Sequence, residues 1–190
     1  MTFDDGPGPY TARLLAIMKR HSARGTFFVV GRNAAANPQV LSQMAAEHHE
    51  IGNHTYDHPD LARLSNMGIR SEVQRTQQAV HQATGRWPTI MRPPYGSLNS
   101  RVNREVGMPV IMWRGDTQDW LYRSSGRVQR RVLKLAKRNA VILVHDVQKT
   151  TVSAMPATLN GLIRRGYTLV TISELYAGSR LLPGHVYGWG

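Results

Sequence analysis

Cysteine is absent from this 190-residue sequence. Disulfides, thiolate zinc sites and cysteine nucleophiles are therefore excluded, and any bound metal must use His, Asp or Glu. The sequence also has no apolar run long enough to cross a membrane, and its first ten residues, MTFDDGPGPY, lack the basic and apolar regions of a signal peptide. We therefore predict no membrane span. The absence of a targeting signal leaves open a cytoplasmic protein or the catalytic part of an exported one.

Acidic residues are scarce, with 12 Asp and Glu against 24 Lys and Arg, which gives a formal charge of +12. Such a surface attracts polyanions, and does so less strongly at high salt. Much of the charge lies in one basic run: Arg123, Arg127, Arg130, Arg131, Lys134, Lys137 and Arg138. Its spacing favours a solvated helix face, with a dedicated polyanion groove as the alternative. We expect no nucleic acid partner, because no aromatic-basic stacking motif or recognition helix is present.

The length fits one domain covering residues 1–190, and short apolar, β-branched runs alternate with helical patterns along it. The predicted strands are a stub at 1–3 and the runs 26–30, 90–91, 110–113, 141–144 and 168–172. The predicted helices are 10–22, 38–49, 69–84, 128–139 and 156–165, the last closed by Gly166. This alternation predicts an α/β fold with a mostly parallel sheet, either a (β/α) barrel or an open doubly wound sheet.

Polar clusters follow most of the predicted strands. They are DDGP (4–7), NHTYDH (53–58), RPPYG (92–96), GDTQDW (115–120) and HD (145–146). Loops that follow the carboxyl ends of parallel strands converge on one face of a sheet, where active sites are built. We therefore expect the five clusters to meet in one place.

Asp5, His54 and His58 are candidate ligands for one metal ion. The two histidines are four residues apart, so both imidazoles can reach the same cation from one side of a helical turn, although Gly52 and Pro59 nearby favour a loop or short turn. Asp5 would complete a three-ligand site with a position left open, as a catalytic metal requires. Polar loop histidines without a metal are the alternative.

The neighbouring carboxylates Asp4 and Asp5 repel each other, and consecutive side chains at a strand end point in different directions. One carboxylate can therefore bind the cation while the other acts as a general base toward water. The alternative is a helix N-cap before the helix that starts near Tyr10.

His145 follows the apolar run AVILV, and a histidine there could protonate a leaving amine if Asp119 or Asp116 stabilises its charged form. A structural pair with Asp146 is the alternative. Arg92 precedes two prolines that stiffen the backbone, so its guanidinium could be a donor held near developing negative charge. A rigid surface turn is the alternative.

Taken together, the clusters resemble the polysaccharide deacetylase family, the NodB-homology domain of the family 4 carbohydrate esterases. Five motifs stand in family order: TFDDGP (2–7), HTYDH (54–58), RPPYG (92–96), DTQDW (116–120) and LVH (143–145). The resemblance spans nearly the whole chain and implies a distorted (β/α) barrel. It also implies a metal-dependent hydrolase that removes N-acetyl groups from N-acetylglucosamine units of a polysaccharide, releasing acetate.

The resemblance also implies a role for each matching residue. Asp4 resembles the general base, which Arg92 orients, and His145 resembles the general acid, which Asp119 tunes. Asp5, His54 and His58 resemble the ligands of one divalent cation, which is zinc first, with cobalt, manganese or nickel as alternatives. The Tyr95 amide resembles an oxyanion donor, and Trp120, Leu143 and Pro94 resemble residues that contact the substrate.

The sequence defines the substrate less closely than it defines the reaction. The basic surface and the segment GYTLVTISELYAGSRLLPGHVYG, which resembles the tail of bacterial wall-modifying members, rank peptidoglycan first, chitin oligomers second and O-acetylated xylan third. A basic cell-wall-binding module is the non-enzymatic alternative. By resemblance we expect a monomer that is extracellular or associated with the cell wall.

One departure from the family concerns the first strand. Family members usually carry several apolar residues before TFDDGP, whereas this sequence begins directly against the motif. Either preceding residues have been trimmed or the metal-bearing loop is held less firmly than usual.

Overall fold

The structure is a computed structural model that describes residues 1–189. Its strands are β1 (Thr2–Asp4), β2 (Thr26–Val29), β3 (Glu50–Asn53), β4 (Val110–Ile111), β5 (Gly115–Asp116), β6 (Ile142–His145) and β7 (Val186–Tyr187). Its α-helices are α1 (Thr11–Arg20), α2 (Gly31–Ala36), α3 (Pro38–Ala46), α4 (Asn66–Thr84), α5 (Ser100–Val106), α6 (Asp119–Tyr122), α7 (Ser125–Leu135), α8 (Lys149–Arg164) and α9 (Ile172–Leu175). Two short 3₁₀ helices are η1 (Leu61–Arg63) and η2 (Pro94–Gly96).

The strands form a parallel sheet of five in the order β3-β2-β1-β6-β5, and a second parallel pair of β4 and β7. Single parallel bridges from Met91 to Asn53 of β3 and to Val110 of β4 join the two sheets. The strands therefore follow one another around an incomplete ring. This arrangement is the distorted (β/α) barrel that the family resemblance implies, and it decides against an open doubly wound sheet.

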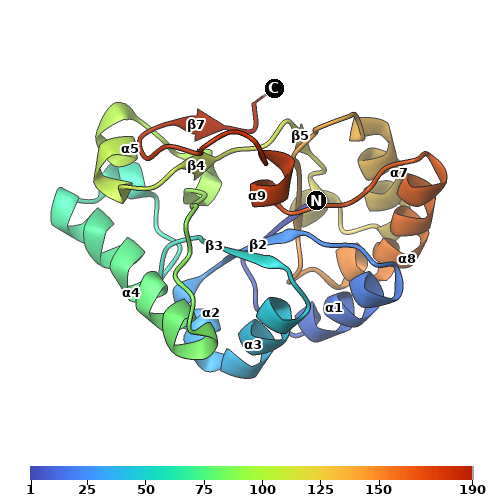
Figure 1. Ribbon diagram of the computed structural model, residues 1–190, viewed down its shortest axis with the longest axis horizontal. Coiled ribbons are helices and arrows are strands. Elements are labelled where there is room, and N and C mark those ends of the chain that lie inside the picture. The colour runs from blue at the N-terminus through green and yellow to red at the C-terminus, as the bar shows by residue number, and fades with distance from the viewer. Residues whose placement is uncertain (190) are drawn as a thin grey trace.

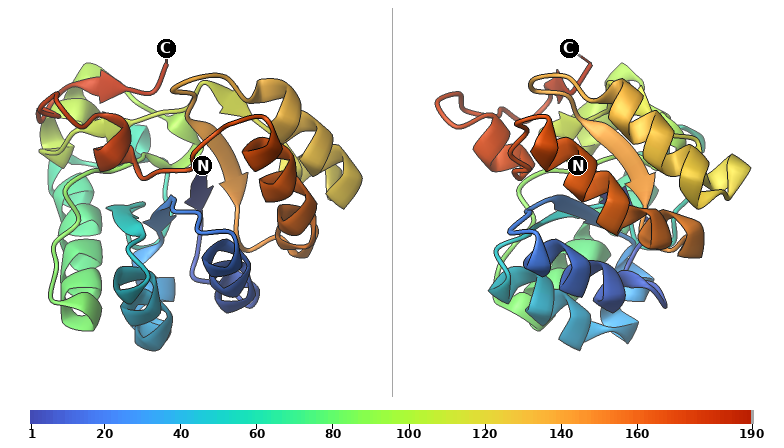
Figure 2. Two further views of the ribbon diagram at one scale, coloured as in Figure 1. Left: turned by 45° about the vertical axis from the view of Figure 1, so that its right-hand side comes forward. Right: turned by 90° about the vertical axis from the view of Figure 1, so that its right-hand side faces the viewer.

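The helices form an arc outside the strands, running from α4 through α2, α3 and α1 to α8 and α7 (Figure 1). The chain begins near the centre of the molecule, and β7 lies at its edge (Figures 1 and 2). The main apolar core lies between sheet and helices, where Phe3 and Phe27 stack with ring centroids 4.8 Å apart beside Leu14, Met18 and Val144. In the described part of the chain, no helix combines the length and apolarity needed to cross a membrane.

Residues that alternate with these core side chains face the inside of the barrel and surround Arg92, which has no exposed surface. The Arg92 guanidinium donates to the Thr2 hydroxyl at 2.9 Å and to the Asp4 carboxylate at 2.8 Å. It also donates to the carbonyl oxygens of Ile111 and Met112, each at 2.9 Å. Four of its five N–H donors thus have partners. Its charge is balanced by Asp4, and its burial is offset by these hydrogen bonds.

Several element predictions require correction. Residues 168–172 form no strand, because Thr171 instead caps α9, its hydroxyl accepting from the Glu174 amide while the Glu174 carboxylate accepts from the Thr171 amide. The predicted strand at 90–91 is reduced to the Met91 bridges. The last long helix begins at Lys149, seven residues earlier than predicted, with Pro156 inside it.

Replacing Arg92 tests whether the charged pair supports the barrel. Arg92→Met should lower the free energy of unfolding by about 3–5 kcal/mol, because it leaves the Asp4 carboxylate buried without its cation. Urea denaturation measures the loss. The exposed Arg130→Met is the control, expected to change stability by only about 0.5 kcal/mol. A loss for Arg92→Met no larger than the control's would contradict a structural role for the pair.

Candidate functional site

Two adjacent carboxylates stand at the carboxyl end of β1, and both reach the same cavity with different partners. Asp4 is buried against Arg92, whereas Asp5 adopts a positive φ of 74° and faces His54 and His58. The Asn33 side-chain amide donates to the Asp5 carbonyl at 2.8 Å and holds this turn. The two residues therefore have different environments, as the strand-end pattern predicts.

His54 and His58 come from the loop that follows β3. Thr55 and His58 have positive φ values of 64° and 63°, so this segment is a loop and not a helical turn. The sequence interpretation as a helical turn is therefore wrong, and the interpretation as a loop is right. The buried Glu72 carboxylate accepts from the Tyr56 and Asp57 amides, each at 2.8 Å, and fixes the loop. The i,i+4 spacing thus brings the rings together through loop geometry rather than through helical periodicity.

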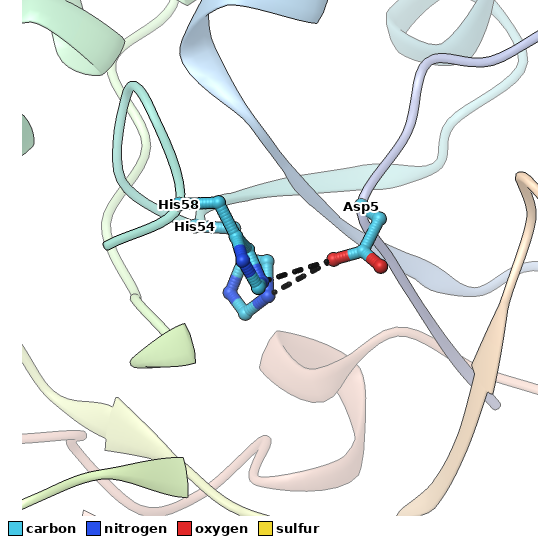
Figure 3. A group of neighbouring side chains, drawn as sticks. All are labelled: Asp5, His54 and His58. Carbon is cyan, nitrogen blue, oxygen red and sulfur yellow. Dashed lines mark ion pairs between the residues drawn. The ribbon is translucent and has the colours of Figure 1, made fainter. Parts of the chain in front are cut away.

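Asp5 Oδ1 lies 3.4 Å from His54 Nε2 and 3.3 Å from His58 Nε2, and both rings point at this carboxylate from the opposite loop (Figure 3). One ligand atom from each residue lies within 4.8 Å of the others. Ligands about 2.0–2.1 Å from a tetrahedral cation are about 3.4 Å apart, so the observed spacing fits a shared metal. Within residues 1–189 this is the one such group of three or more His, Asp or Glu side chains.

The polar partners of the group also fit a cation. His54 Nδ1 donates to the Arg92 carbonyl oxygen at 2.6 Å, which directs Nε2 toward Asp5. Asp5 Oδ1 is buried and has no hydrogen-bond partner among the described residues. Burial opposes ionisation of Asp5, but the rings of His54 and His58 outweigh it and hold the pKa of this carboxyl well below its usual range. One carboxylate oxygen and two imidazole nitrogens that converge on one point are a donor set suited to a divalent cation.

His145, at the end of β6, faces this group across the site. Its Nδ1 donates to Asp119 Oδ1 at 2.8 Å, and its backbone amide donates to Asp119 Oδ2 at 2.8 Å. The Thr151 hydroxyl also donates to Asp119, at 2.6 Å. Burial disfavours the charged ring, but the hydrogen bond and charge of Asp119 outweigh burial and raise the pKa of His145 to about 9. His145 is therefore placed to carry a proton at neutral pH.

Of the two carboxylates considered as partners for His145, the structure brings Asp119 to it. Asp116 instead accepts from the Gln118 amide at 2.7 Å and faces the cavity described below. Thr151 is a further partner that the sequence analysis missed. No motif marked it, because it lies in the first turn of α8, before the segment that was predicted to be helical.

Asp146, directly after His145, is fully buried beneath the loop that carries Asp5. The Thr11 hydroxyl donates to its carboxyl group and itself accepts from the Gly8 amide at 2.8 Å. Gly6 lies so close to this carboxyl that a side chain there would collide with it. Burial raises the pKa of Asp146 to about 7. Asp146 therefore joins the loops after β1 and β6, whereas the ring of His145 pairs with Asp119 rather than with Asp146.

These groups open into one cavity of about 440 Å³. It is lined by Asp4, Asp5, His54, His58, Pro93, Tyr95, Trp113, Asp116, Trp120, Leu143 and His145. Arg92 and Asp119 lie behind the wall, in contact with Asp4 and His145. Pro94 is buried and does not line the cavity, whereas Pro93 does. Trp113 was not predicted as a wall residue, although its place at the end of a predicted strand was a usable signal.

Removing one ligand tests the metal group. Loss of a residue that only hydrogen-bonds to a metal ligand weakens metal binding by about 10–100-fold. Asp5→Asn should weaken Zn²⁺ binding by more than this, because a charged ligand is lost. Competition with a chromogenic chelator measures the affinity. Asp116→Asn is the matched control, since this carboxylate lines the same cavity outside the group. Equal losses in the two variants would exclude the three-ligand site.

Replacing Asp119 tests its effect on His145. In the metal-free protein, Asp119→Asn should move the pKa of His145 from about 9 toward its ordinary value, because the charge that stabilises the imidazolium is removed. NMR titration of the ring measures the pKa. Thr151→Val keeps the carboxylate and should leave the pKa raised. A His145 pKa that is unchanged in Asp119→Asn would show that Asp119 does not control it.

Comparison with known proteins gives the chain a family. Over 188 residues it is 43% identical to the peptidoglycan-N-acetylglucosamine deacetylase PgdA of Listeria monocytogenes, covering 98% of this chain and 40% of that protein. The solved structure described as T48 deacetylase with substrate matches with a TM-score of 0.96 and 42% identity, covering 98% of this chain and 94% of the other. The acetyl xylan esterase of Clostridium thermocellum, solved with a cobalt ion, matches with a TM-score of 0.93 and 28% identity over 98% of this chain and 96% of the other.

The chain thus spans about two fifths of the length of the Listeria relative but nearly all of the two solved domains. A profile of the family described as polysaccharide deacetylase matches residues 1–111, more than half of the sequence. This segment includes the end of β1, the loop after β3 and η2, which contribute to the cavity, and Arg92 behind its wall. The chain belongs to the polysaccharide deacetylase family.

Proposed function

We propose that residues 1–190 are the catalytic domain of a metal-dependent N-deacetylase that acts on N-acetylglucosamine units of peptidoglycan. The observation that carries this proposal is the meeting of Asp5, His54 and His58 with Asp4 and His145 in one cavity. Similarity to a peptidoglycan deacetylase over nearly the whole chain supports the reaction and the substrate class.

Asp5, His54 and His58 would hold the cation. A set of two imidazoles and one carboxylate is typical of catalytic zinc, and cobalt, manganese and nickel accept the same ligands. When bound, such a cation supplies Lewis-acid chemistry, polarising the acetyl carbonyl and making water a stronger acid.

Asp4 is the general base of the proposed mechanism. Its Oδ1 accepts from Arg92, which fixes the orientation of the carboxylate, and its Oδ2 lies 3.7 Å from His54 Nε2, directly beside the metal group. Oδ2 can therefore take the proton from an attacking water molecule. Arg92 acts through Asp4, as a positioning residue.

His145 is the general acid, because its raised pKa keeps the ring protonated until it gives its proton to the departing amine. The Tyr95 amide is the proposed donor to the oxyanion of the tetrahedral intermediate. Trp120 and Leu143 supply apolar walls for the acetyl methyl group. Water adds to the acetyl carbon, the C–N bond breaks, and acetate and a free glucosamine amine are released.

The strong positive charge favours an anionic cell-wall polymer as substrate, and with it action outside the cell or at its wall. Chitin oligomers and acetylated xylan are the alternatives, the latter because of the similarity to an acetyl xylan esterase. A wall-binding module without activity would not need His145 paired with Asp119 opposite a three-ligand metal group.

Measurement of acetate release tests this proposal. Asp4→Asn and His145→Ala should each lower kcat on peptidoglycan strands by about 10²–10⁴-fold, the range that one acid or base group contributes. His185→Ala, an exposed histidine outside the cavity, should keep normal activity. Strong chelation should abolish release, and added Zn²⁺ should restore it. Near-normal release by either catalytic variant would contradict the assigned roles.

The same assay identifies the substrate when peptidoglycan strands, N-acetylglucosamine oligomers and acetylated xylan are compared at equal acetyl concentration. The highest kcat/KM is expected for peptidoglycan. A preference for xylan would replace the proposed amide substrate by an ester.

A further inference from the structure

An exposed aromatic surface leads out of the cavity along α6. Asp119 begins this helix and points inward to His145, while the next three residues, Trp120, Leu121 and Tyr122, are 48%, 52% and 41% exposed. Trp120 lines the cavity itself. Large apolar side chains are usually buried unless they contact a ligand or partner, so this rim is a candidate for binding a part of the substrate outside the cavity.

The same segment is strongly basic. Residues 119–138 contain seven cationic side chains, and the one acidic residue among them, Asp119, is buried. The seven are Arg123, Arg127, Arg130, Arg131, Lys134, Lys137 and Arg138. None of them forms an ion pair within the described residues. Their charge is therefore uncompensated and attracts anions to this side of the cavity.

Two of these arginines are held by contacts beside the cavity. The Arg127 guanidinium carbon lies 3.2 Å from the centroid of the Tyr122 ring, and Arg131 donates to the Asp116 carbonyl oxygen at 3.1 Å. A guanidinium stacked on an aromatic ring keeps its N–H edge free for a carboxylate. Tyr122 and Arg127 therefore form a preorganised pair of an aromatic surface and a cation.

The opposite rim has no comparable excess of charge. The loop that carries His58 also carries Asp57 and Asp60, which pair with Arg75 at 2.9 Å and with Arg63 at 3.3 Å. The cavity is of the size that holds a small ligand, so the next units of a polymer must lie on one rim or the other. An anionic unit is favoured on the α6 side, where unpaired cations are more numerous.

We propose that Tyr122 and Arg127 form a subsite for a carboxylate-bearing unit of an anionic glycan, next to the unit whose acetyl group enters the cavity. The subsite rests on the proposed function, because it places the acidic unit relative to the reacting one. The sugar contacts the Tyr122 ring and the carboxylate accepts from Arg127. In peptidoglycan such a carboxylate belongs either to the lactyl group of the neighbouring sugar or to the attached peptide.

The test compares kcat/KM for acetate release on two kinds of strand. One is a neutral N-acetylglucosamine oligomer, and the other is a peptidoglycan strand of similar length that carries carboxylates. Arg127→Gln should lower the ratio of carboxylated to neutral kcat/KM by about tenfold, the effect of one charge-assisted hydrogen bond at a partly exposed site. Tyr122→Leu should lower the ratio in the same direction by removing the stacking surface.

Arg13→Gln is the matched control, because Arg13 is an exposed arginine on α1 that forms no ion pair with another described residue. An equal change of the ratio in Arg13→Gln and Arg127→Gln would indicate diffuse charge attraction and overturn the subsite, as would an unchanged ratio in Arg127→Gln. Strands with and without their peptides distinguish the two sources of the carboxylate. If the wild-type protein with Zn²⁺ releases no acetate from either kind of strand, the proposed function fails, whereas activity with an unchanged ratio refutes the subsite alone.

Discussion

The hydrogen bonds of the buried Arg92 guanidinium connect the barrel to the candidate site. Two of its partners, Thr2 and Asp4, belong to β1, and the carbonyl oxygens it binds belong to Ile111 and Met112 at the end of β4. These strands have no pairing with each other, so the arginine links them across the interior. Its own carbonyl oxygen accepts from His54. One residue thus orients the proposed base through its side chain and a proposed metal ligand through its backbone.

The different environments of Asp4 and Asp5 follow from this constraint. Asp4 is drawn inward by Arg92, and the strand alternation together with the positive φ of Asp5 then turns the second carboxylate toward the two histidines. The histidine rings favour the ionised form of Asp5, whereas Asp119 favours the charged form of His145. Environments that separate the pKa values of neighbouring groups are typical of sites that need an acid and a base at the same pH.

The sequence predicted the site better than the elements beneath it. The parallel α/β sheet and the meeting of the five clusters could be predicted because carboxyl ends of parallel strands share one face, whatever the exact strand boundaries, whereas the choice of a barrel came from the family resemblance. The prediction of a strand at 168–172 was wrong because Thr171, one of its β-branched residues, fits a capping box with Glu174 equally well. β3, with the sequence EIGN, was missed because it is half-polar and contains a glycine.

The His54–His58 loop could not be derived from spacing, since its two positive φ residues depend on hydrogen bonds to Glu72, 14 residues beyond His58. Thr151 likewise became visible only when α8 packed beside β6.

Charge is distributed unevenly between the inside and the outside of the site. Only 12 acidic residues offset 24 basic ones, yet Asp4, Asp5 and Asp116 line a single cavity and Asp119 lies behind its wall. Asp4 and Asp119 are balanced by Arg92 and His145, which leaves Asp5 with the two histidines as the place where a cation is best accommodated. The uncompensated arginines lie outside, along α6 and α7. A divalent cation is thereby favoured inside the cavity and a polyanion along its rim. The same basic surface would repel the cation if the acidic groups were not gathered at the strand ends, so this arrangement makes the overall charge compatible with the candidate metal site.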